Sequence, residues 1–249
     1  MEALGIIPAR FDSKRFPGKP LAKILNKPMI QWVYEGARKS KLLDKVLVAT
    51  DDERIVSEVQ NFGGEVLLTS PRHPSGTDRV AEVAQKFEVD YVVNIQGDEP
   101  LVHGRDIDRV LELMHSQPEV SVATLVTRFN NYEELHKSDT CKVVMDKDGH
   151  AIYFSRARIP YVAEEKNHSL DNYFKHVGLY FFTKERLLEF VNLPPSHLEQ
   201  LERLEQLRFI ENGIKVRVVK TQNVYFPVDR QQDIPIVEKY LKLREQSGC

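Results

Sequence analysis

Four basic side chains lie in one short loop near the start of the chain. In the segment IIPARFDSKRFPGKPL, the cations Arg10, Lys14, Arg15 and Lys19 are accompanied by a single acid, Asp12. Such closely spaced cations repel one another unless an anion lies between them, and a triphosphate offers many oxygen atoms to both Arg and Lys. The segment matches neither GxGxxG nor GxxxxGK[ST]. We therefore expect a phosphate-binding loop of another kind, with a solvated basic loop as the alternative.

Acidic residues in two distant segments could bind a metal ion. Asp98 and Glu99 follow the apolar stretch in VVNIQGDEP, and Asp229 follows a short apolar run in PVDRQQDIPIVEKY. Magnesium prefers oxygen ligands and typically takes one or two carboxylates together with phosphate oxygens. Asp98 is thus a candidate metal ligand. Asp229 is a candidate second ligand, although taken alone it also fits the cap of a helix.

The segment HPSGTDRVAEV has two interpretations that are compatible with each other. Ser75, Thr77 and Asp78 stand just before an amphipathic pattern, where their side chains can cap a helix. Alternatively, the small side chains and Gly76 let the backbone approach a pyrimidine base. A backbone carbonyl oxygen could then accept a hydrogen bond from the amino group of cytosine. The sequence leaves both interpretations open.

Short apolar runs alternate with helical patterns in the first half of the chain. This alternation predicts an α/β fold, a mostly parallel, Rossmann-like twisted sheet with helices on both faces. Ligands bind beyond the carboxyl ends of the strands in such sheets, so the loops after Ile7, Ala49, Thr69 and Gln96 should contain the site. We expect strands at 4–7, 45–49, 65–69, 91–96 and 120–126, and helices beginning near 28, 52, 77 and 105.

The second half has a different character. Lys147-Asp148-Gly149 between two apolar runs predicts a hairpin of 141–146 with 151–155. Further strands are expected at 173–182 and 215–220, one leucine-rich helix at 198–210 and a final helix at 233–242. We interpret this half as an antiparallel extension of a single domain. Its nucleotide-binding part would span about 1–130 and its remaining part about 131–249.

The composition excludes several classes of protein. The chain has 249 residues, of which 41% are hydrophobic and 29% charged, as in ordinary globular proteins. Its net charge is −2, which provides no broad basic surface for nucleic acid or an anionic membrane. Cys141 and Cys249 form neither a disulfide framework nor a zinc motif. No targeting or membrane-spanning segment is evident, so a cytoplasmic enzyme or binding protein is expected.

Together these segments resemble the 3-deoxy-manno-octulosonate cytidylyltransferases, also called CMP-Kdo synthetases, over nearly the whole chain. IIPAR and PGKPL are shared with wider sugar nucleotidyltransferases and indicate only the class. Other segments in family order are more specific, and they are NKPMI, VATDD, SGTDR, NIQGDEP, AIYFSRARIPY, HVGLY and LERLEQLR. The resemblance implies transfer of CMP from CTP to Kdo, a step of lipopolysaccharide biosynthesis, with Mg²⁺ as cofactor and a homodimeric assembly.

The resemblance also implies roles for individual residues. Those implied to grip the triphosphate are Arg10, Arg15 and Lys19. Those implied to contact the cytosine and ribose are Gly76, Thr77 and Gln96. The acids Asp98 and Asp229 would hold the metal. The acid sugar would contact Arg156, His176, Tyr180, Glu205 and Gln206. For Glu205 and Gln206 the polar face of a leucine-rich helix is the competing interpretation.

One segment departs from the family pattern, and three rival functions remain. After Asp229 the family usually continues with a Thr-Pro-Glu-Asp-like stretch, whereas this chain has Arg230-Gln231-Gln232-Asp233. A CMP-sialate synthetase would use CTP and another 2-keto acid. A nucleotidyltransferase for a sugar or polyol phosphate would want a second basic cluster, which the second half lacks. A nucleotide-binding regulatory module would not need Asp98 and Asp229 together.

Overall fold

The computed structural model describes residues 1–13, 15–164 and 169–246. Lys14 of the basic loop and the C-terminal Cys249 lie outside these ranges. The chain forms two compact units, one containing residues 1–112 and 224–249 and the other containing 113–223. Residues 224–249, which the sequence placed with the second part, thus belong to the first unit. The two units are described in turn.

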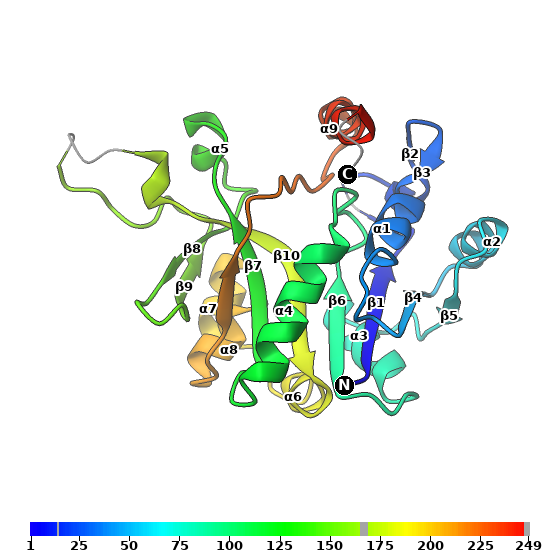
Figure 1. The fold of residues 1–249 in the computed structure, drawn as a ribbon, viewed down its shortest axis with the longest axis horizontal. Helices are drawn as coiled ribbons and strands as arrows, with labels where there is room; N and C mark the ends of the chain where they lie inside the picture. The colour runs from blue at the N-terminus through cyan, green and yellow to red at the C-terminus, as the bar shows by residue number, and fades with distance from the viewer. Residues whose placement is uncertain (14, 165–168, 247–249) are drawn as a thin grey trace. The chain divides into compact units, whose positions relative to one another are not determined.

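The first unit is built on a parallel sheet with the strand order β6-β1-β4-β5 (Figure 1). Its strands are β1 (Ala3–Ala9), β4 (Lys45–Thr50), β5 (Val66–Leu68) and β6 (Tyr91–Ile95). β1 pairs in parallel with both β4 and β6, and β4 pairs in parallel with β5. Every residue of β1 is buried, so both faces of the sheet are covered. The predicted α/β class is therefore confirmed.

Helices connect these strands and begin close to the predicted positions. They are α1 (Met29–Ala37), α2 (Glu53–Asn61), α3 (Gly76–Ala84), α4 (Gly104–Ser116) and α9 (Ile234–Gln246), with short 3₁₀ turns η1 (Lys19–Leu21) and η4 (Gln231–Asp233). The Asp52 carboxylate accepts from the N–H of Arg54 and caps α2. The Ser75 hydroxyl accepts from the N–H of Asp78 and caps α3. The helix-cap interpretation of the 75–78 segment is thus confirmed.

A two-strand hairpin that the sequence did not suggest precedes α1. β2 (Lys23–Ile24) pairs with β3 (Lys27–Pro28) across a turn in which Leu25 has φ 47° and Asn26 φ 67°. Left-handed backbone is typical of tight hairpin turns, but it is unusual for leucine. The Leu25 N–H donates to the Glu238 carboxylate of α9 at 3.1 Å. A contact with the distant C-terminal helix therefore supports the turn.

The C-terminal segment packs against the first unit through apolar side chains and polar anchors. One buried cluster joins residues from both ends of the chain, namely Ile24, Met29, Leu101, Val228, Val237 and Leu241. The buried Tyr225 hydroxyl donates to the Asp106 carboxylate at 2.9 Å. These contacts explain why the segment lies in this unit, because its apolar side chains find their buried surface there.

The second unit contains the antiparallel structure predicted for the second half. Its strands are β7 (Val122–Thr127), β8 (Lys142–Met145), β9 (Ala151–Ser155), β10 (Lys175–Thr183) and β11 (Arg217–Lys220). β7 pairs antiparallel with β10 and parallel with β11, while β8 and β9 form the predicted hairpin. Its helices are α5 (Tyr132–His136), α6 (Lys184–Phe190), α7 (His197–Glu202) and α8 (Leu207–Glu211), with the 3₁₀ turn η3 (Leu170–Asn172).

The single leucine-rich helix predicted over 198–210 is wrong. α7 ends at Glu202, Arg203 adopts a left-handed conformation with φ 54°, and α8 begins only at Leu207. The largely buried Arg208 guanidinium donates to the two Glu199 carboxylate oxygens at 2.7 and 2.6 Å. This bidentate pair holds α8 against α7, a tertiary arrangement that a continuous helix would not allow.

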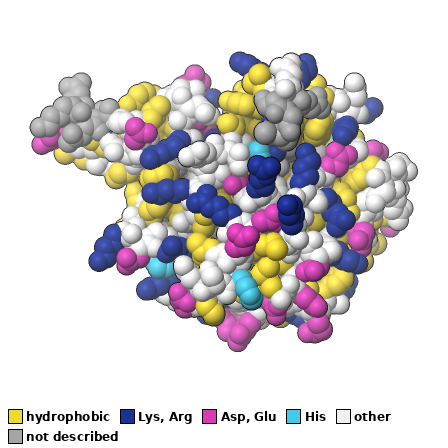
Figure 2. Space-filling view, in the orientation of Figure 1, with side chains coloured by type: hydrophobic (Ala, Val, Ile, Leu, Met, Phe, Trp, Pro, Cys, Tyr) yellow, Lys and Arg dark blue, Asp and Glu magenta, His cyan; other side chains and the backbone are white. Residues whose placement is uncertain are grey.

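Two surface properties agree with the composition. In the part of the chain that the structure describes, no helix is long and apolar enough to cross a membrane. On the face shown in Figure 2, Lys and Arg side chains (dark blue) are interspersed with Asp and Glu (magenta). The presence of both signs of charge is consistent with the small net charge.

Candidate active site

The basic loop is closed on itself at the carboxyl end of β1. The carbonyl oxygen of Phe11 accepts from the N–H groups of Ser13 at 3.0 Å and Gly18 at 2.9 Å. Gly18 has φ 70°, and the Phe11 ring lies 3.2 Å from where a side chain would begin, so glycine is required. The Arg54 guanidinium stacks on the Phe11 ring, 3.3 Å from the ring centroid. The loop therefore has a defined shape that holds Lys19 at the start of η1.

Each predicted metal ligand is paired with a predicted phosphate-binding cation. Lys19 Nζ lies 2.6 Å from Asp98 Oδ2, and Arg15 Nη2 lies 2.8 Å from Asp229 Oδ1. The Val228 N–H donates to the Asp98 carbonyl oxygen at 2.9 Å, which brings the two acidic segments side by side. Two cations and two carboxylates that are far apart in sequence thus form one charge-balanced cluster.

The donor set of this cluster fits a magnesium ion. Within the described residues no three His, Cys, Asp or Glu side chains gather as a metal site. Asp98 and Asp229 are two acids, and Mg²⁺ bound with a nucleotide takes one or two carboxylates and completes its shell with phosphate oxygens and water. Both carboxylates are partly exposed, with 26% and 24% of their side chains accessible. They can therefore reach an ion that arrives with a phosphate.

The sequence that departs from the family pattern forms a defined turn after Asp229. One Asp233 carboxylate oxygen accepts from the N–H of Asp229 at 2.9 Å and from that of Arg230 at 2.7 Å. These bonds begin η4 and leave the Asp229 side chain on Arg15. Asp233 therefore supplies the capping acid of this turn.

Arg10 connects the end of β1 to the loop before α3. Its Nη2 donates to the carbonyl oxygens of His73 at 2.5 Å and Ser75 at 3.0 Å. Burial lowers the pKa of Arg10 from its usual value, and repulsion by the neighbouring Arg79 lowers it further. Arg10 is still charged at neutral pH. It places a cation beside the segment that the sequence associates with a pyrimidine.

The predicted cytosine and ribose residues are also neighbours. Asn94 donates from its amide to the Thr77 hydroxyl at 3.3 Å and accepts from the Gln96 amide at 3.1 Å. A side chain added at Gly76 would lie 3.4 Å from Pro8 and 3.9 Å from Gln96 Oε1. Gly76, Thr77 and Gln96 thus meet at the carboxyl ends of β1 and β6, the edge at which such sheets bind ligands.

In the second unit, four predicted sugar-binding residues are linked to one another or to Cys141 by the interactions that follow. The His176 and Tyr180 rings are 5.2 Å apart, and the Gln206 amide lies 3.5 Å from the Cys141 sulfur. Glu205 and Cys141 both act on the Tyr180 hydroxyl, whose pKa burial raises well above its usual value. Glu205 and Gln206 lie in the turn between α7 and α8, so they are not polar-face residues of one helix.

The ring of His176 is neutral in this cluster. Burial lowers its pKa from 6.5 to about 3, and its Nε2 lies 3.0 Å from the Thr124 hydroxyl. The buried Tyr180 hydroxyl has no hydrogen-bond partner among the described residues. An unsatisfied buried hydroxyl is costly, so a polar ligand group here would be stabilising. His176 and Tyr180 can therefore offer hydrogen bonds, but not a charge, to a ligand.

Arg156 is held by backbone carbonyl oxygens. Its guanidinium donates to Glu202 at 2.8 Å, Ser138 at 3.0 Å and Arg203 at 3.2 Å. Its N–H also donates to the Glu202 carboxylate at 2.9 Å. The three carbonyl partners of the guanidinium are thus neutral, and the Glu202 carboxylate binds the backbone N–H instead. The cation is therefore fixed in place by neutral acceptors and keeps its charge for a carboxylate ligand.

The sequence analysis missed three residues that shape these sites. The fully buried Lys142 ammonium donates to the carbonyl oxygens of Lys137, Thr140 and Arg156 at 2.7, 2.8 and 2.7 Å. Burial raises the pKa of Cys141 to about 12, so its thiol is not reactive. Arg79 is also fully buried. Only its place in SGTDR could have drawn attention to Arg79.

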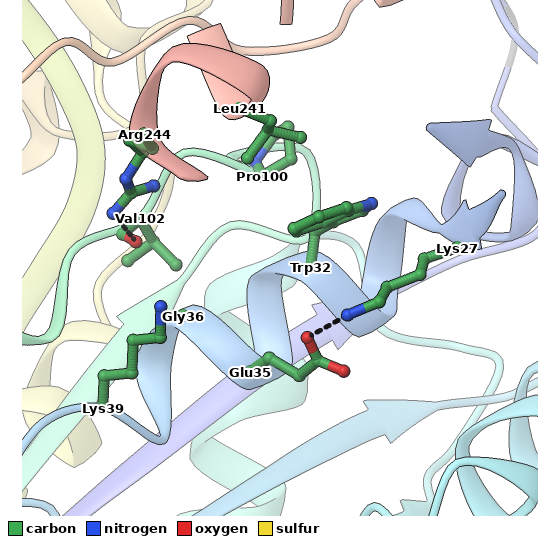
Figure 3. A pocket seen from close by; sticks show the side chains of 9 residues that line it. All are labelled: Lys27, Trp32, Glu35, Gly36, Lys39, Pro100, Val102, Leu241 and Arg244. Atoms are coloured by element: carbon green, nitrogen blue, oxygen red, sulfur yellow. Dashed lines mark hydrogen bonds and ion pairs between the residues drawn. The ribbon is translucent and has the colours of Figure 1, made fainter. Parts of the chain in front are cut away.

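A separate pocket in the first unit holds none of the predicted residues. It encloses about 200 Å³ and is lined by Lys27, Trp32, Glu35, Gly36, Lys39, Pro100, Val102, Leu241 and Arg244. Figure 3 shows the ion pair of Lys27 with Glu35, which measures 2.8 Å, at the pocket. It also shows the Arg244 guanidinium, which donates to the Val102 carbonyl oxygen at 3.4 Å. Three of the charged side chains that line the pocket thus already bind groups of the protein.

Comparison with known proteins identifies the family. A model of the cytidylyltransferase family matches residues 4–218. The chain is 46% identical to the 3-deoxy-manno-octulosonate cytidylyltransferase of Thermodesulfovibrio yellowstonii over 97% of this chain and 98% of the relative. The chain belongs to this family. The enzyme of the same name from Solibacter usitatus is 48% identical, covering 96% of this chain and 94% of the relative.

Two solved structures resemble this chain. A CMP:2-keto-3-deoxy-manno-octonic acid synthetase in complex with CTP superposes with a TM-score of 0.91 at 40% identity, covering 98% of this chain and all of the other. A cytidylyltransferase from Leptospira borgpetersenii has a TM-score of 0.66 at 15% identity, covering 98% of this chain and 87% of the other. The second similarity supports the fold alone.

Proposed function

We propose that this protein transfers CMP from CTP to 3-deoxy-D-manno-octulosonate (Kdo), giving CMP-Kdo and pyrophosphate for lipopolysaccharide biosynthesis. The observation that carries the proposal is the charge-balanced cluster of Lys19 with Asp98 and Arg15 with Asp229 at the ligand edge of the sheet. Full-length relatives named for this reaction support the choice of substrates. They do not favour sialate as the sugar.

In the first unit, the protein's own groups would bind and orient the nucleotide. Arg10, Arg15 and Lys19 would neutralise the triphosphate. Their positive charges would stabilise the negative charge that develops on the departing pyrophosphate. Gly76 and Thr77 would receive the base, with Gln96 near the ribose. Phosphoryl transfer needs little more than in-line positioning and charge stabilisation, so this arrangement suits attack by the sugar's anomeric hydroxyl on the α-phosphorus.

Asp98 and Asp229 would hold a magnesium ion. When bound, the ion would neutralise phosphate charge and favour ionisation of the attacking hydroxyl. Phosphate oxygens would then take the place of the two carboxylates as partners of Lys19 and Arg15.

In the second unit, Arg156 would bind the carboxylate of the acid sugar, a pairing of a guanidinium with a planar anion. His176, Tyr180, Glu205 and Gln206 would hydrogen-bond its hydroxyl groups. Since His176 is neutral, it would orient the sugar without competing with Arg156 for the carboxylate. This division gives the anionic end and the hydroxyl-rich end of Kdo different partners.

The decisive experiment measures pyrophosphate release with each of CTP, UTP, ATP and GTP, with Kdo or sialate, and with or without Mg²⁺. We expect rapid release only with CTP, Kdo and Mg²⁺, and CMP-Kdo as the product. The Asp98→Asn protein serves as the matched control for contaminating enzymes. Release with sialate but not with Kdo, or at an equal rate without any divalent ion, would contradict the proposal.

Homodimeric assembly and a cytoplasmic location are further parts of the proposal. They rest on the family resemblance, and sedimentation equilibrium tests the first of them. A mass near 28.8 kDa at micromolar concentration would contradict a dimer, because that is the mass of one chain. Fractionation of cells that make the protein tests the second, and recovery with the membranes would contradict it.

A further inference from the structure

Arg79 is a fully buried cation at the ligand edge of the first unit. It lies in α3, and its side chain is 0% exposed. Its Nη1 donates to the Thr69 hydroxyl at 2.5 Å, and its Nη2 lies 3.2 Å from the Asp51 carboxylate. The Thr69 hydroxyl in turn donates to the Thr50 carbonyl oxygen at 3.0 Å. Burying a charge is costly, so this position calls for a reason beyond packing.

The charges around Arg10 suggest that reason. Arg79 lowers the pKa of Arg10, whereas Asp51 and Asp78 raise it, so all three side chains act electrostatically on Arg10. Asp78 is engaged by the Ser75 hydroxyl at 2.6 Å, and Asp51 by Arg79. Arg10 itself donates to carbonyl oxygens. Both neighbouring acids are thus bound by groups other than Arg10.

We propose that Arg79 is a positioning residue for the triphosphate, because it binds Asp51 and so prevents that carboxylate from pairing with Arg10. Without Arg79, the uncompensated carboxylate would attract the Arg10 guanidinium and repel phosphate. With Arg79 in place, Arg10 stays on the carbonyl oxygens of His73 and Ser75, and its charge acts on the nucleotide. This inference rests on the proposed function, since it takes CTP as the ligand.

The test compares CTP binding by calorimetry, with Mg²⁺ and no sugar, across the wild type and four variants. Arg79→Met removes the charge at similar length, and Arg79→Lys retains the charge without the planar fork. Asp51→Asn removes the acid, and Arg79→Met/Asp51→Asn removes both charges. We expect Arg79→Met to weaken CTP binding by about tenfold or more, since a partly buried carboxylate loses its counter-ion. The other three proteins should bind CTP within about threefold of the wild type.

A purely structural role predicts a different pattern. In that case the double variant would bind CTP as weakly as Arg79→Met, and Asp51→Asn would give no rescue, which would overturn the inference. If Arg79→Met does not fold, the folded Arg79→Lys variant provides the test. Tenfold weaker CTP binding by Arg79→Lys would show that a positive charge at this position is not sufficient for CTP binding, and it would overturn the inference. In turnover, Arg79→Met should raise the KM for CTP and leave the KM for Kdo within about twofold.

The experiment also separates this inference from the proposed function. A wild-type protein that binds no CTP would count against the function itself. Equal CTP affinity in the wild type and Arg79→Met would overturn only the role of Arg79.

Discussion

The neutral ring of His176 makes stability depend on pH. Its folded pKa of about 3 lies below the 6.5 expected for an unfolded chain. Between these two values the unfolded chain binds a proton that the folded protein does not. The contribution of His176 is therefore fully present above pH 6.5 and is lost as the pH falls towards 3. We predict that His176→Gln weakens this pH dependence, because an amide does not titrate.

The expected size follows from the two pKa values. A pH of about 5 is roughly 1.5 units below the unfolded pKa, and each unit corresponds to about 1.4 kcal/mol. The wild type should therefore lose about 2 kcal/mol more than His176→Gln between pH 8 and pH 5. Any folded pKa below about 4 gives nearly the same difference at that pH, because the folded ring stays neutral there.

The assay is urea unfolding of both proteins at pH 8 and at pH 5. The single tryptophan, Trp32, lies in the first unit, so its fluorescence does not report directly on the unit that contains His176. Far-UV circular dichroism is the better signal, because it includes the backbone of the second unit. Burial is the main cause that lowers the pKa of His103 to about 4, so His103 also makes the free energy of unfolding fall as the pH falls. It is present in both proteins, so its contribution cancels in the difference.

Two results would refute this reasoning. An equal loss of stability in both proteins would mean that His176 titrates alike in the folded and unfolded states. A larger loss in His176→Gln would mean that a charged ring is stabilised in the fold. Either outcome would also remove the argument that His176 offers the sugar a neutral hydrogen bond.

Three further variants test other parts of the structure. Asp98→Asn should retain the fold by circular dichroism but reduce kcat by about a hundredfold or more, as the loss of a metal contact does, and near-normal turnover would remove Asp98 from that role. Arg156→Ala should raise the KM for Kdo far more than that for CTP, and equal rises would contradict the division between the units. Gly97→Ala should lower the melting temperature, because its new carbon would lie 2.9 Å from the Pro8 carbonyl oxygen, and an unchanged melting curve would show that the strand ends can separate.

The sequence was most informative where local patterns and burial agree. The strands of the first sheet are continuous apolar runs because both faces are covered, and the caps at Asp52 and Ser75 depend only on neighbouring residues. The predicted phosphate cations could be placed at one edge because parallel strands end together. Their pairing with Asp98 and Asp229 could not be predicted, since it depends on how distant segments fold together.

Predictions failed where tertiary contacts override local preference. The leucine spacing of 198–210 favours one helix, yet the Glu199–Arg208 pair and the left-handed Arg203 divide it. Leu25 adopts a left-handed turn without a glycine, supported by Glu238 from the other end of the chain. The role of the buried Lys142 could not be predicted, because its partners are backbone carbonyl oxygens, which every residue type has.

The bond from the Val228 N–H to the Asp98 carbonyl has a consequence for how the enzyme matures. During synthesis the basic loop and Asp98 emerge early, whereas Asp229, the partner of Arg15, emerges much later. A nascent or prematurely terminated chain would therefore hold Arg15 without its acid. The four-residue charge cluster is therefore complete only after the segment that carries Asp229 has packed against the earlier part of the first unit.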